Sequence, residues 1–289
     1  MHCTQLCAMR FAQFVEVVKG TLYIVSTPIG NLEDITLRAL RVLKEVDVIA
    51  AEDTRHSSKL LSHFGIAKPL ISYWGEKEKV KSEDVLERLR VGQSVALISD
   101  AGTPGISDPG GVLIEKAVEE GISVVPVPGP SALIAALSIS GLPMKEFSFV
   151  GFLPPKKGQR QKYLRELSLE RRTLVFYEAP HRVLETIEDM AEILVDRRAA
   201  LVKEITKIHE EVLRGNLGEI LELLSERTIM GEYVVIVEGR REGAISLDEA
   251  LSEVKSLMKK GKGRKEAVKA VAEQYGHSKK ELYDRSLGE

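Results

Sequence analysis

The chain has 289 residues, 44% of them hydrophobic, and a formal net charge of −2 at pH 7. These values fit a soluble globular protein with room for two domains, and no run of 18 apolar residues predicts a membrane span. The balanced charge means that any nucleic-acid-binding surface must be local. Because the only cysteines are Cys3 and Cys7, a disulfide framework is excluded and a reducing, cytoplasmic setting is expected.

The first half of the chain alternates apolar runs with helical segments. The runs that predict buried strands are 21–26, 47–51, 69–73, 94–98 and 122–127. Helices are expected from the N-cap Thr36 to Val46, and over 57–64, 82–91, 112–120 and 132–139. Continuous apolar strands separated by helices are typical of a parallel sheet covered on both faces. We therefore predict an α/β domain over residues 20–146, preceded by an extension over residues 1–19.

A second, smaller α/β domain with a mixed sheet is predicted over residues 147–241. Its runs 199–205 and 209–214 have no helix between them, so antiparallel pairing is expected.

Residues 245–289 contain no predicted strand. Two capping boxes, Ser246 with Glu249 and Ser278 with Glu281, start helices there, and the last two helices have helix-turn-helix spacing. From Leu251 onward this tail has ten Lys or Arg against six Asp or Glu, which makes it a basic helical unit.

The segment Ser99–Gly111, SDAGTPGISDPGG, is neither strand nor helix in pattern. Its four glycines permit close approach of a ligand to the main chain, and its carboxylates and hydroxyls follow a predicted parallel strand. A tight turn rich in turn formers is the alternative interpretation. The sequence has no Walker A motif, no G-x-G-x-x-G after the first strand, no G-x-S-x-G and no metal-binding His/Cys spacing, so no metal is expected.

Six predicted strand-end loops carry polar tips. They are 27–31, 52–56, 99–111, 128–131, 178–182 and 203–207. Each alone can be an ordinary turn or helix start. Together they favour a small-molecule site in a cleft between two domains.

These loops carry a family resemblance. The strings LYIVSTPIGNLEDIT from Leu22, AEDTR from Ala51, SDAGTP from Ser99 with SDPG from Ser107, VPGPS from Val127, GFLP from Gly151 and FYE from Phe176 occur in order. They closely resemble the ribosomal RNA methyltransferases of the tetrapyrrole methylase family. One departure is Tyr73–Lys77, YWGEK, where the family usually has a His-rich stretch.

The resemblance implies S-adenosylmethionine bound between two α/β domains and methylation of a cytidine 2′-hydroxyl in 16S ribosomal RNA near the decoding centre. A carboxylate favours the positive sulfur of that donor, so Asp100 is the leading donor contact. The other expected contacts on this wall are Ser99, Ala101, Gly102, Pro104, Ser107, Pro128, Ser131 and Ala132. By resemblance, the adenosine side is expected to be held by Tyr177, Glu178, Ala179, Gly231, Glu232 and Tyr233.

A ribose hydroxyl must lose its proton during methyl transfer, and a general base assists this. Asp53, Glu204 and His56 are candidate bases, with Asp53 and Arg55 preferred. An Asp–Arg pair or a helix N-cap is the equally weighted structural interpretation of Asp53. Lys203, Arg55 and Arg182 are candidates to stabilise an alkoxide or to bind phosphate.

RNA binding requires local positive charge. Residues 154–172 have seven Lys or Arg against two Glu, and the tail is a second basic segment. The expected RNA contacts are Lys156, Lys157, Arg160, Arg182, Lys203, Lys262, Arg264, Lys279 and Lys280. The aromatic side chains Tyr73, Trp74 and Phe152 are candidates to stack on unpaired bases.

A homodimer that acts on the small ribosomal subunit is the favoured hypothesis. Two alternatives remain: a methyltransferase of the same fold with a tetrapyrrole or another small substrate, and a non-catalytic RNA-binding or ribosome assembly factor.

Overall fold

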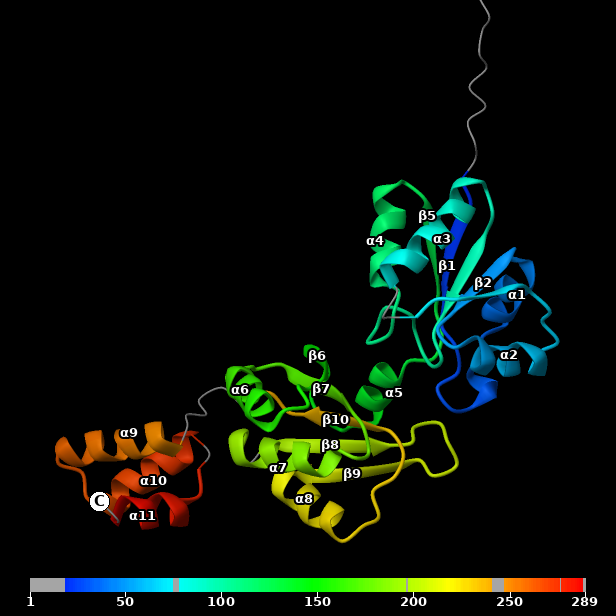
Figure 1. Ribbon diagram of the computed structural model, residues 1–289. Helices are drawn as coiled ribbons and strands as arrows, with labels where there is room; N and C mark the ends of the chain where they lie inside the picture. The colour runs from blue at the N-terminus through cyan, green and yellow to red at the C-terminus, as the bar shows by residue number, and fades with distance from the viewer. Residues whose placement is uncertain (1–18, 75–77, 196, 241–246, 276, 288–289) are drawn as a thin grey trace, which may run out of the picture. The chain divides into compact units, whose positions relative to one another are not determined.

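The computed structural model describes residues 19–74, 78–195, 197–240, 247–275 and 277–287. The chain divides into two compact units (Figure 1). Unit 1 comprises Met1–Ala135 and Glu204–Glu210, and unit 2 comprises Ala136–Lys203 and Glu211–Glu289. The predicted extension over residues 1–19 lies outside the described residues except at its last position.

Unit 1 is built on a five-stranded sheet in the order β3-β2-β4-β1-β5, in which every pair is parallel. The strands are β1 (Thr21–Val25), β2 (Val48–Ala51), β3 (Leu70–Ser72), β4 (Val95–Ile98) and β5 (Ser123–Val127). The predicted parallel sheet is thereby confirmed. Because all five strands run the same way, their carboxyl ends lie at one edge of the sheet.

Helices cover both faces of this sheet, since two separate apolar clusters flank it. One contains Leu22, Leu97 and Leu113, and the other contains Val25, Val42 and Ile98. The helices are η1 (Leu32–Asp34), α1 (Leu37–Glu45), α2 (Thr54–His63), α3 (Glu78–Arg90), α4 (Gly111–Glu119) and α5 (Ala132–Ile139), the last of which crosses into unit 2.

Two predicted helix starts were wrong, and capping explains one of them. Thr36 caps α1 as expected, by accepting from the Ala39 N–H at 3.0 Å. The second helix begins at Thr54 instead of Ser57, because Asp53 is its N-cap. The third begins at Glu78 instead of Ser82, whose hydroxyl lies inside the helix and donates to the Glu78 carbonyl at 2.7 Å.

Unit 2 contains a mixed sheet in the order β6-β7-β10-β8-β9. Its strands are β6 (Phe147–Phe152), β7 (Thr173–Glu178), β8 (Arg198–Lys203), β9 (Glu211–Asn216) and β10 (Tyr233–Val237). The predicted antiparallel pairing of β8 with β9 is confirmed. One face packs on α6 (Lys157–Leu167), α7 (Val183–Ile193) and α8 (Leu217–Ser225) through a core that includes Phe176, Ile187 and Val235.

The tail forms a three-helix cluster with its own small core. Its helices are α9 (Leu247–Lys259), α10 (Arg264–Tyr275) and α11 (Lys279–Leu287). Val254, Val271 and Leu282 are fully or almost fully buried among them. The Glu281 N–H donates to Ser278 Oγ at 3.3 Å, so this predicted cap is present, whereas Ser246 of the other box lies outside the described residues.

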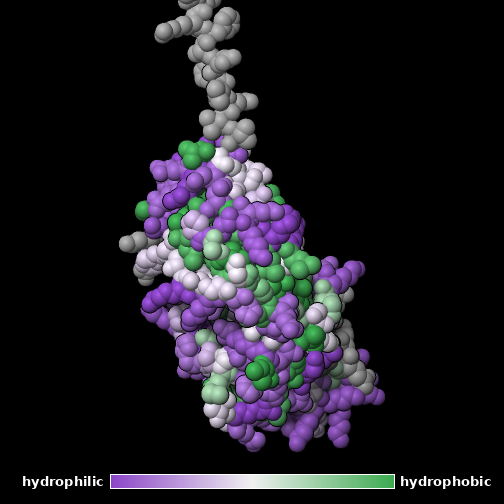
Figure 2. Space-filling view, turned by 90° about the vertical axis from the view of Figure 1, so that its right-hand side faces the viewer, coloured by the Kyte–Doolittle hydropathy of each residue, from purple (hydrophilic) through white to green (hydrophobic). Residues whose placement is uncertain are grey.

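On the face shown in Figure 2, hydrophilic side chains predominate and hydrophobic side chains gather in patches. None of the helices in the described ranges has the length and apolar composition needed to cross a bilayer.

Candidate functional site

The loops that follow β1 and β4 are joined at the carboxyl edge of the unit 1 sheet. Thr27 and Gly102 exchange backbone hydrogen bonds of 2.9 and 3.0 Å, and the Thr27 hydroxyl donates to the Ser99 carbonyl at 3.0 Å. The hydroxyls of Ser26 and Thr103 lie 2.8 Å apart. These contacts bring the two predicted loops together and fix the main chain of the first half of Ser99–Gly111.

Glycine is required at the far end of this loop. Gly110 has a φ of 146°, and a Cβ there would lie 3.1 Å from both the Gly105 nitrogen and Leu97 Cδ2. A side chain would therefore be strained and crowded at once. The main chain of the loop folds back on itself, since the Gly105 N–H donates to the Pro109 carbonyl at 3.2 Å.

The loops after β2 and β4 are joined through carboxylates. Asp100 Oδ1 accepts from the Asp53 N–H at 3.1 Å, and Glu52 Oε2 lies 3.5 Å from the Asp100 nitrogen as its acceptor. Asp108, in the same loop as Asp100, is half-buried and hydrogen-bonded with Ser99. Three acidic side chains thus share one edge of the sheet.

This crowding changes the acidity of two of the carboxyls. Burial raises the pKa of Glu52, and the negative charges of Asp108, Asp100 and Asp53 raise it further. Burial also raises the pKa of Asp108, with Asp100 adding to the effect and the hydrogen bond with Ser99 opposing it. A cation beside these two carboxyls would favour their charged forms and so oppose the rise in pKa. Within the described residues no group of potential ligands is placed to hold a metal ion.

Glu78 is a residue of this site that the sequence analysis missed. Its Oε1 accepts from the Gly110 N–H at 2.9 Å, the Val112 N–H at 3.2 Å and the Tyr73 hydroxyl at 3.1 Å. Glu78 thereby caps α4, whose own N-cap, Gly110, has no side chain to do so. The sequence gives no sign of this role, because Glu78 precedes Gly110 by 32 residues and approaches it only in the folded chain.

The predicted stacking role of Tyr73 was wrong. The side chain is buried, and its hydroxyl bonds Glu78 and Ser82. Burial raises the pKa of the phenol, which therefore remains a hydroxyl donor.

Asp53 is in the capping position. Its Oδ1 accepts from the N–H groups of Arg55 at 2.7 Å and His56 at 3.3 Å, and these bonds lower its pKa. Arg55 is 93% exposed, and its Nε lies 3.9 Å from Asp53 Oδ1. The N-cap interpretation of Asp53 is thus realised, and its lowered pKa makes it a weak proton acceptor.

Glu204 lies in the segment of unit 1 that joins β8 to β9. It has a φ of 48°, and its carboxylate forms a 2.9 Å ion pair with Lys207. The Lys207 side chain packs against Gly30, since a Cβ added to Gly30 would lie only 2.4 Å from Lys207 Cγ. Through its ion pair with Lys207, Glu204 is therefore linked to the loop that follows β1.

Two predicted contact residues of unit 2 have internal partners. Glu178 is buried and accepts from the Ala179 N–H at 2.9 Å and the Thr186 hydroxyl at 2.8 Å. Arg182 Nε lies 3.5 Å from Glu178, and its Nη2 donates to the Leu153 carbonyl at 2.7 Å. The Arg182 guanidinium thus holds the main chain after β6. An arginine that binds RNA is expected instead to have its guanidinium available to phosphate.

Arg160 corrects the predicted RNA surface most clearly. It is 1% exposed, and its Nε lies 2.6 Å from Oδ2 of the equally buried Asp189. It is a structural ion pair, and we remove it from the RNA candidates. The other basic positions are accessible or half-buried: Lys156, Lys157, Lys262, Lys279 and Lys280 are exposed, while Arg264 and Lys203 are intermediate.

The remaining predicted donor contacts differ in accessibility. Ala101, Ser107, Pro128 and Glu232 are exposed, Ser131, Ala132, Tyr177, Ala179 and Gly231 are intermediate, and Ser99, Gly102, Pro104 and Tyr233 are buried.

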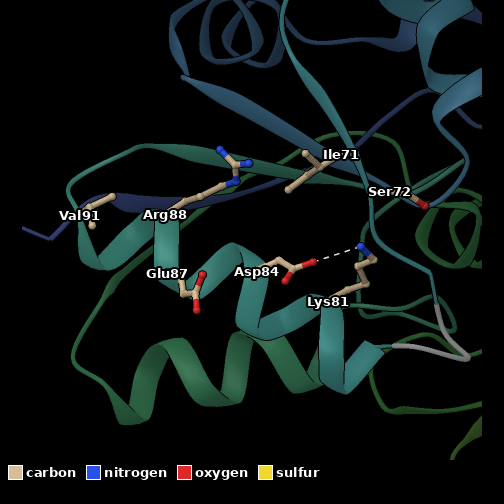
Figure 3. A pocket seen from close by; sticks show the side chains of 7 residues that line it. All are labelled: Ile71, Ser72, Lys81, Asp84, Glu87, Arg88 and Val91. Carbon is tan, nitrogen blue, oxygen red and sulfur yellow. Dashed lines mark hydrogen bonds and ion pairs between the residues drawn. The ribbon is translucent and has the colours of Figure 1, made fainter.

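A separate open pocket of about 440 Å³ lies between β3 and α3 (Figure 3). Its lining consists of Ile71, Ser72, Lys81, Asp84, Glu87, Arg88 and Val91. Lys81 and Asp84 pair across 3.1 Å at its rim. None of the predicted site residues lines this pocket.

Residues 21–221 match the family model described as Tetrapyrrole (Corrin/Porphyrin) Methylases. The chain belongs to this family and is a methyltransferase, which confirms the resemblance found in its sequence. It is 47% identical over 272 residues to a Ribosomal RNA small subunit methyltransferase I from Halalkalibacterium halodurans, covering 92% of this chain and 94% of the relative. A protein of the same name from Escherichia coli O157:H7 is 44% identical, with 96% and 99% covered.

Solved structures agree on the fold. A Thermus thermophilus uroporphyrin-III C-methyl transferase in complex with S-adenosyl homocysteine aligns with a TM-score of 0.54 and 23% identity, covering 76% of this chain and 97% of the other. A diphthine synthase aligns with a TM-score of 0.58 and 15% identity, covering 76% and 90%.

Proposed function

We propose that this protein transfers a methyl group from S-adenosylmethionine to small-subunit ribosomal RNA, at the 2′-hydroxyl of a cytidine near the decoding centre. The observation that carries the proposal is the 47% identity, over nearly the full length of both chains, to a relative named Ribosomal RNA small subunit methyltransferase I. Similarity over 92% of this chain extends to both units and at least part of the tail.

The acidic edge of unit 1 fits this donor. S-adenosylmethionine supplies an electrophilic methyl group on a positively charged sulfur. Asp100 and Asp108 would face that charge, while Glu52 holds the Asp100 main chain. The Gly102–Gly105 backbone would lie against the methionine portion, because its two glycines permit close approach of a ligand to the main chain.

The residues of the chain would mainly align the two reactants, which alone can contribute ~7–11 kcal/mol. Proton removal from the ribose hydroxyl then needs an acceptor. Glu204 is the better candidate, because the capping bonds of Asp53 lower the pKa of that carboxyl. Lys207 beside Glu204 can stabilise developing negative charge on the hydroxyl oxygen.

RNA would be held by exposed lysines on both basic segments. Lys156 and Lys157 precede and begin α6, and Lys262, Lys279 and Lys280 lie on the tail. We also propose that the protein acts in the cytoplasm as a homodimer.

Transfer of tritiated methyl from S-adenosylmethionine to 30S subunits tests the function. The subunits are purified from a strain that lacks the corresponding methyltransferase, and labelled nucleosides are identified by mass spectrometry. Label in a 2′-O-methylcytidine of 16S RNA is the expected result. Label in a porphyrinogen and none in the subunits would contradict it. The matched control uses subunits from the wild-type strain, which are already methylated and should accept no label.

A further inference from the structure

Strand β6 contains a bulge that changes the direction of one aromatic side chain. Phe149 pairs with Val175, but Gly151 pairs with Phe176 and Phe152 with Tyr177, so one extra residue lies on β6. Gly151 has a φ of 73°, which explains a glycine at this position. Without the bulge, Phe149 and Phe152 would point to opposite faces. With it, both share the face of Tyr177.

The Tyr177 ring contacts both phenylalanine rings edge to face. The ring centroids of Phe149 and Tyr177 are 4.9 Å apart at 67°, and those of Phe152 and Tyr177 are 5.8 Å apart at 63°. Such contacts fix ring orientation and contribute beyond the buried area. Tyr177 thus supports Phe152 from one side.

Phe152 nevertheless remains 53% exposed. This exposure does not come from a loose loop, because Gly151 and Leu153 on either side are buried. The Leu153 carbonyl is also held by Arg182 at 2.7 Å. An apolar ring that stays exposed to water forgoes the favourable free energy of burial. Exposed aromatic rings held in one orientation are typical of binding surfaces.

Positive charge lies next to this ring in the sequence. Lys156 and Lys157 are exposed four and five residues after Phe152, and Lys162 and Arg165 are exposed further along α6. An aromatic surface followed by cations matches a nucleotide, whose base stacks and whose phosphate is anionic.

We propose that Phe152, supported by Tyr177, stacks on an unpaired base of the RNA substrate. The proposal rests on the function proposed above and adds a specific RNA subsite to it. Phe152 acts in substrate binding, and the lysines that follow hold the adjoining phosphates.

The test compares Phe152→Ala and Phe152→Leu, which remove the ring, with Phe152→Tyr, which keeps it. Leu169→Ala is the matched control, because Leu169 is 66% exposed in unit 2 and is not part of the aromatic cluster. Methyl transfer gives KM and kcat for 30S subunits, and calorimetry gives the donor Kd. Quenching of a 2-aminopurine-containing oligoribonucleotide reports stacking directly.

We expect Phe152→Ala and Phe152→Leu to raise KM for the RNA by ~5- to 100-fold and to abolish the quenching. Phe152→Tyr and Leu169→Ala should stay close to wild type, and all four variants should keep the wild-type donor Kd and a cooperative thermal unfolding transition. An unchanged RNA KM in Phe152→Leu overturns the stacking proposal, as does a loss confined to donor binding. If the wild-type protein itself labels no RNA, the proposed function fails instead, and the two failures are thereby separated.

Discussion

The backbone N–H of Asp53 donates to Oδ1 of Asp100 across 3.1 Å and so joins the loops after two neighbouring strands. The carboxylate of Asp100 therefore has an internal partner on one oxygen, while the side chain stays partly accessible. Replacing Asp100 by asparagine therefore tests its charge separately from its hydrogen bond. The asparagine oxygen can still accept from the Asp53 N–H, but the negative charge is lost.

Asp100→Asn should fold normally and bind S-adenosylmethionine ~10- to 150-fold more weakly, since a charge-assisted contact is worth about 1.5–3 kcal/mol. Asp100→Ala should lose stability as well as donor affinity. Asp47→Asn is the matched control, because Asp47 bonds Ser94 at the start of β2, away from the carboxyl ends of the strands. Calorimetry with equal donor affinity in Asp100→Asn and the wild type would remove Asp100 from the donor site.

Donor binding should depend on pH through Glu52 and Asp108, whose pKa values burial raises. Protonation of these carboxyls removes the negative charge that favours a sulfonium. S-adenosylmethionine affinity should therefore fall as pH decreases through the raised pKa values, and affinity for S-adenosylhomocysteine, with its neutral sulfur, should fall less. Calorimetry of both ligands from pH 8 to pH 5 measures the difference. Parallel pH profiles for the two ligands would argue against an electrostatic role.

The same carboxyls affect the stability of the protein without ligand. A carboxyl with a raised pKa binds its proton more readily in the folded than in the unfolded state, so stability falls as pH rises through that pKa. Glu52→Gln should flatten this part of the stability profile. Glu119→Gln, at an exposed position on α4, should leave it unchanged. Urea unfolding at closely spaced pH values provides the comparison.

Glu78 should control the order of the Ser99–Gly111 loop. Glu78→Ala leaves the Gly110 and Val112 N–H groups without their carboxylate acceptor, at a cost of about 1–3 kcal/mol, and should speed their hydrogen exchange. Glu78→Gln retains an acceptor oxygen and should restore most of the protection. Glu83→Ala is a control on the same helix, since Glu83 pairs with Arg90 and Lys116. Equal exchange in all variants would refute the capping role.

Arg160→Ala should destabilise unit 2 by about 3–5 kcal/mol, because it leaves the buried Asp189 carboxylate without its close partner. Lys156→Ala should change the free energy of unfolding little, since that lysine is exposed. The loss of RNA affinity should be larger in Lys156→Ala than in Arg160→Ala. A stable Arg160→Ala variant with weakened RNA binding would instead restore Arg160 to the RNA surface.

The exposed tail lysines should contribute electrostatic RNA affinity. Replacing Lys262, Lys279 and Lys280 by glutamine should reduce the slope of log affinity against log salt by about 2, if each contacts one phosphate of single-stranded RNA. The donor Kd should not change. Filter binding over a range of salt concentrations measures the slope, and a slope equal to that of the wild type would show that the tail does not touch RNA.

Most of the fold could be predicted from the sequence, because apolar strands and helix caps such as Thr36 depend on residues close together in the chain. The prediction failed where a side chain bonds to an element far away in the sequence. Glu78 caps α4 from α3, and Arg160 is drawn inward by Asp189, 29 residues later. A basic residue within a basic segment gives no sign of such a buried partner. The bulge at Gly151 was likewise invisible in the apolar pattern of β6.

The five strands of unit 1 are complete by Val127, yet Glu204–Glu210 belongs to the same unit. During synthesis the sheet can therefore form well before the chain that carries Lys207 to Gly30 exists. A fragment that ends at residue 135 would have the entire sheet and an unfinished surface over Gly30. Unit 1 is therefore complete only after synthesis has passed β8 and produced the segment that precedes β9.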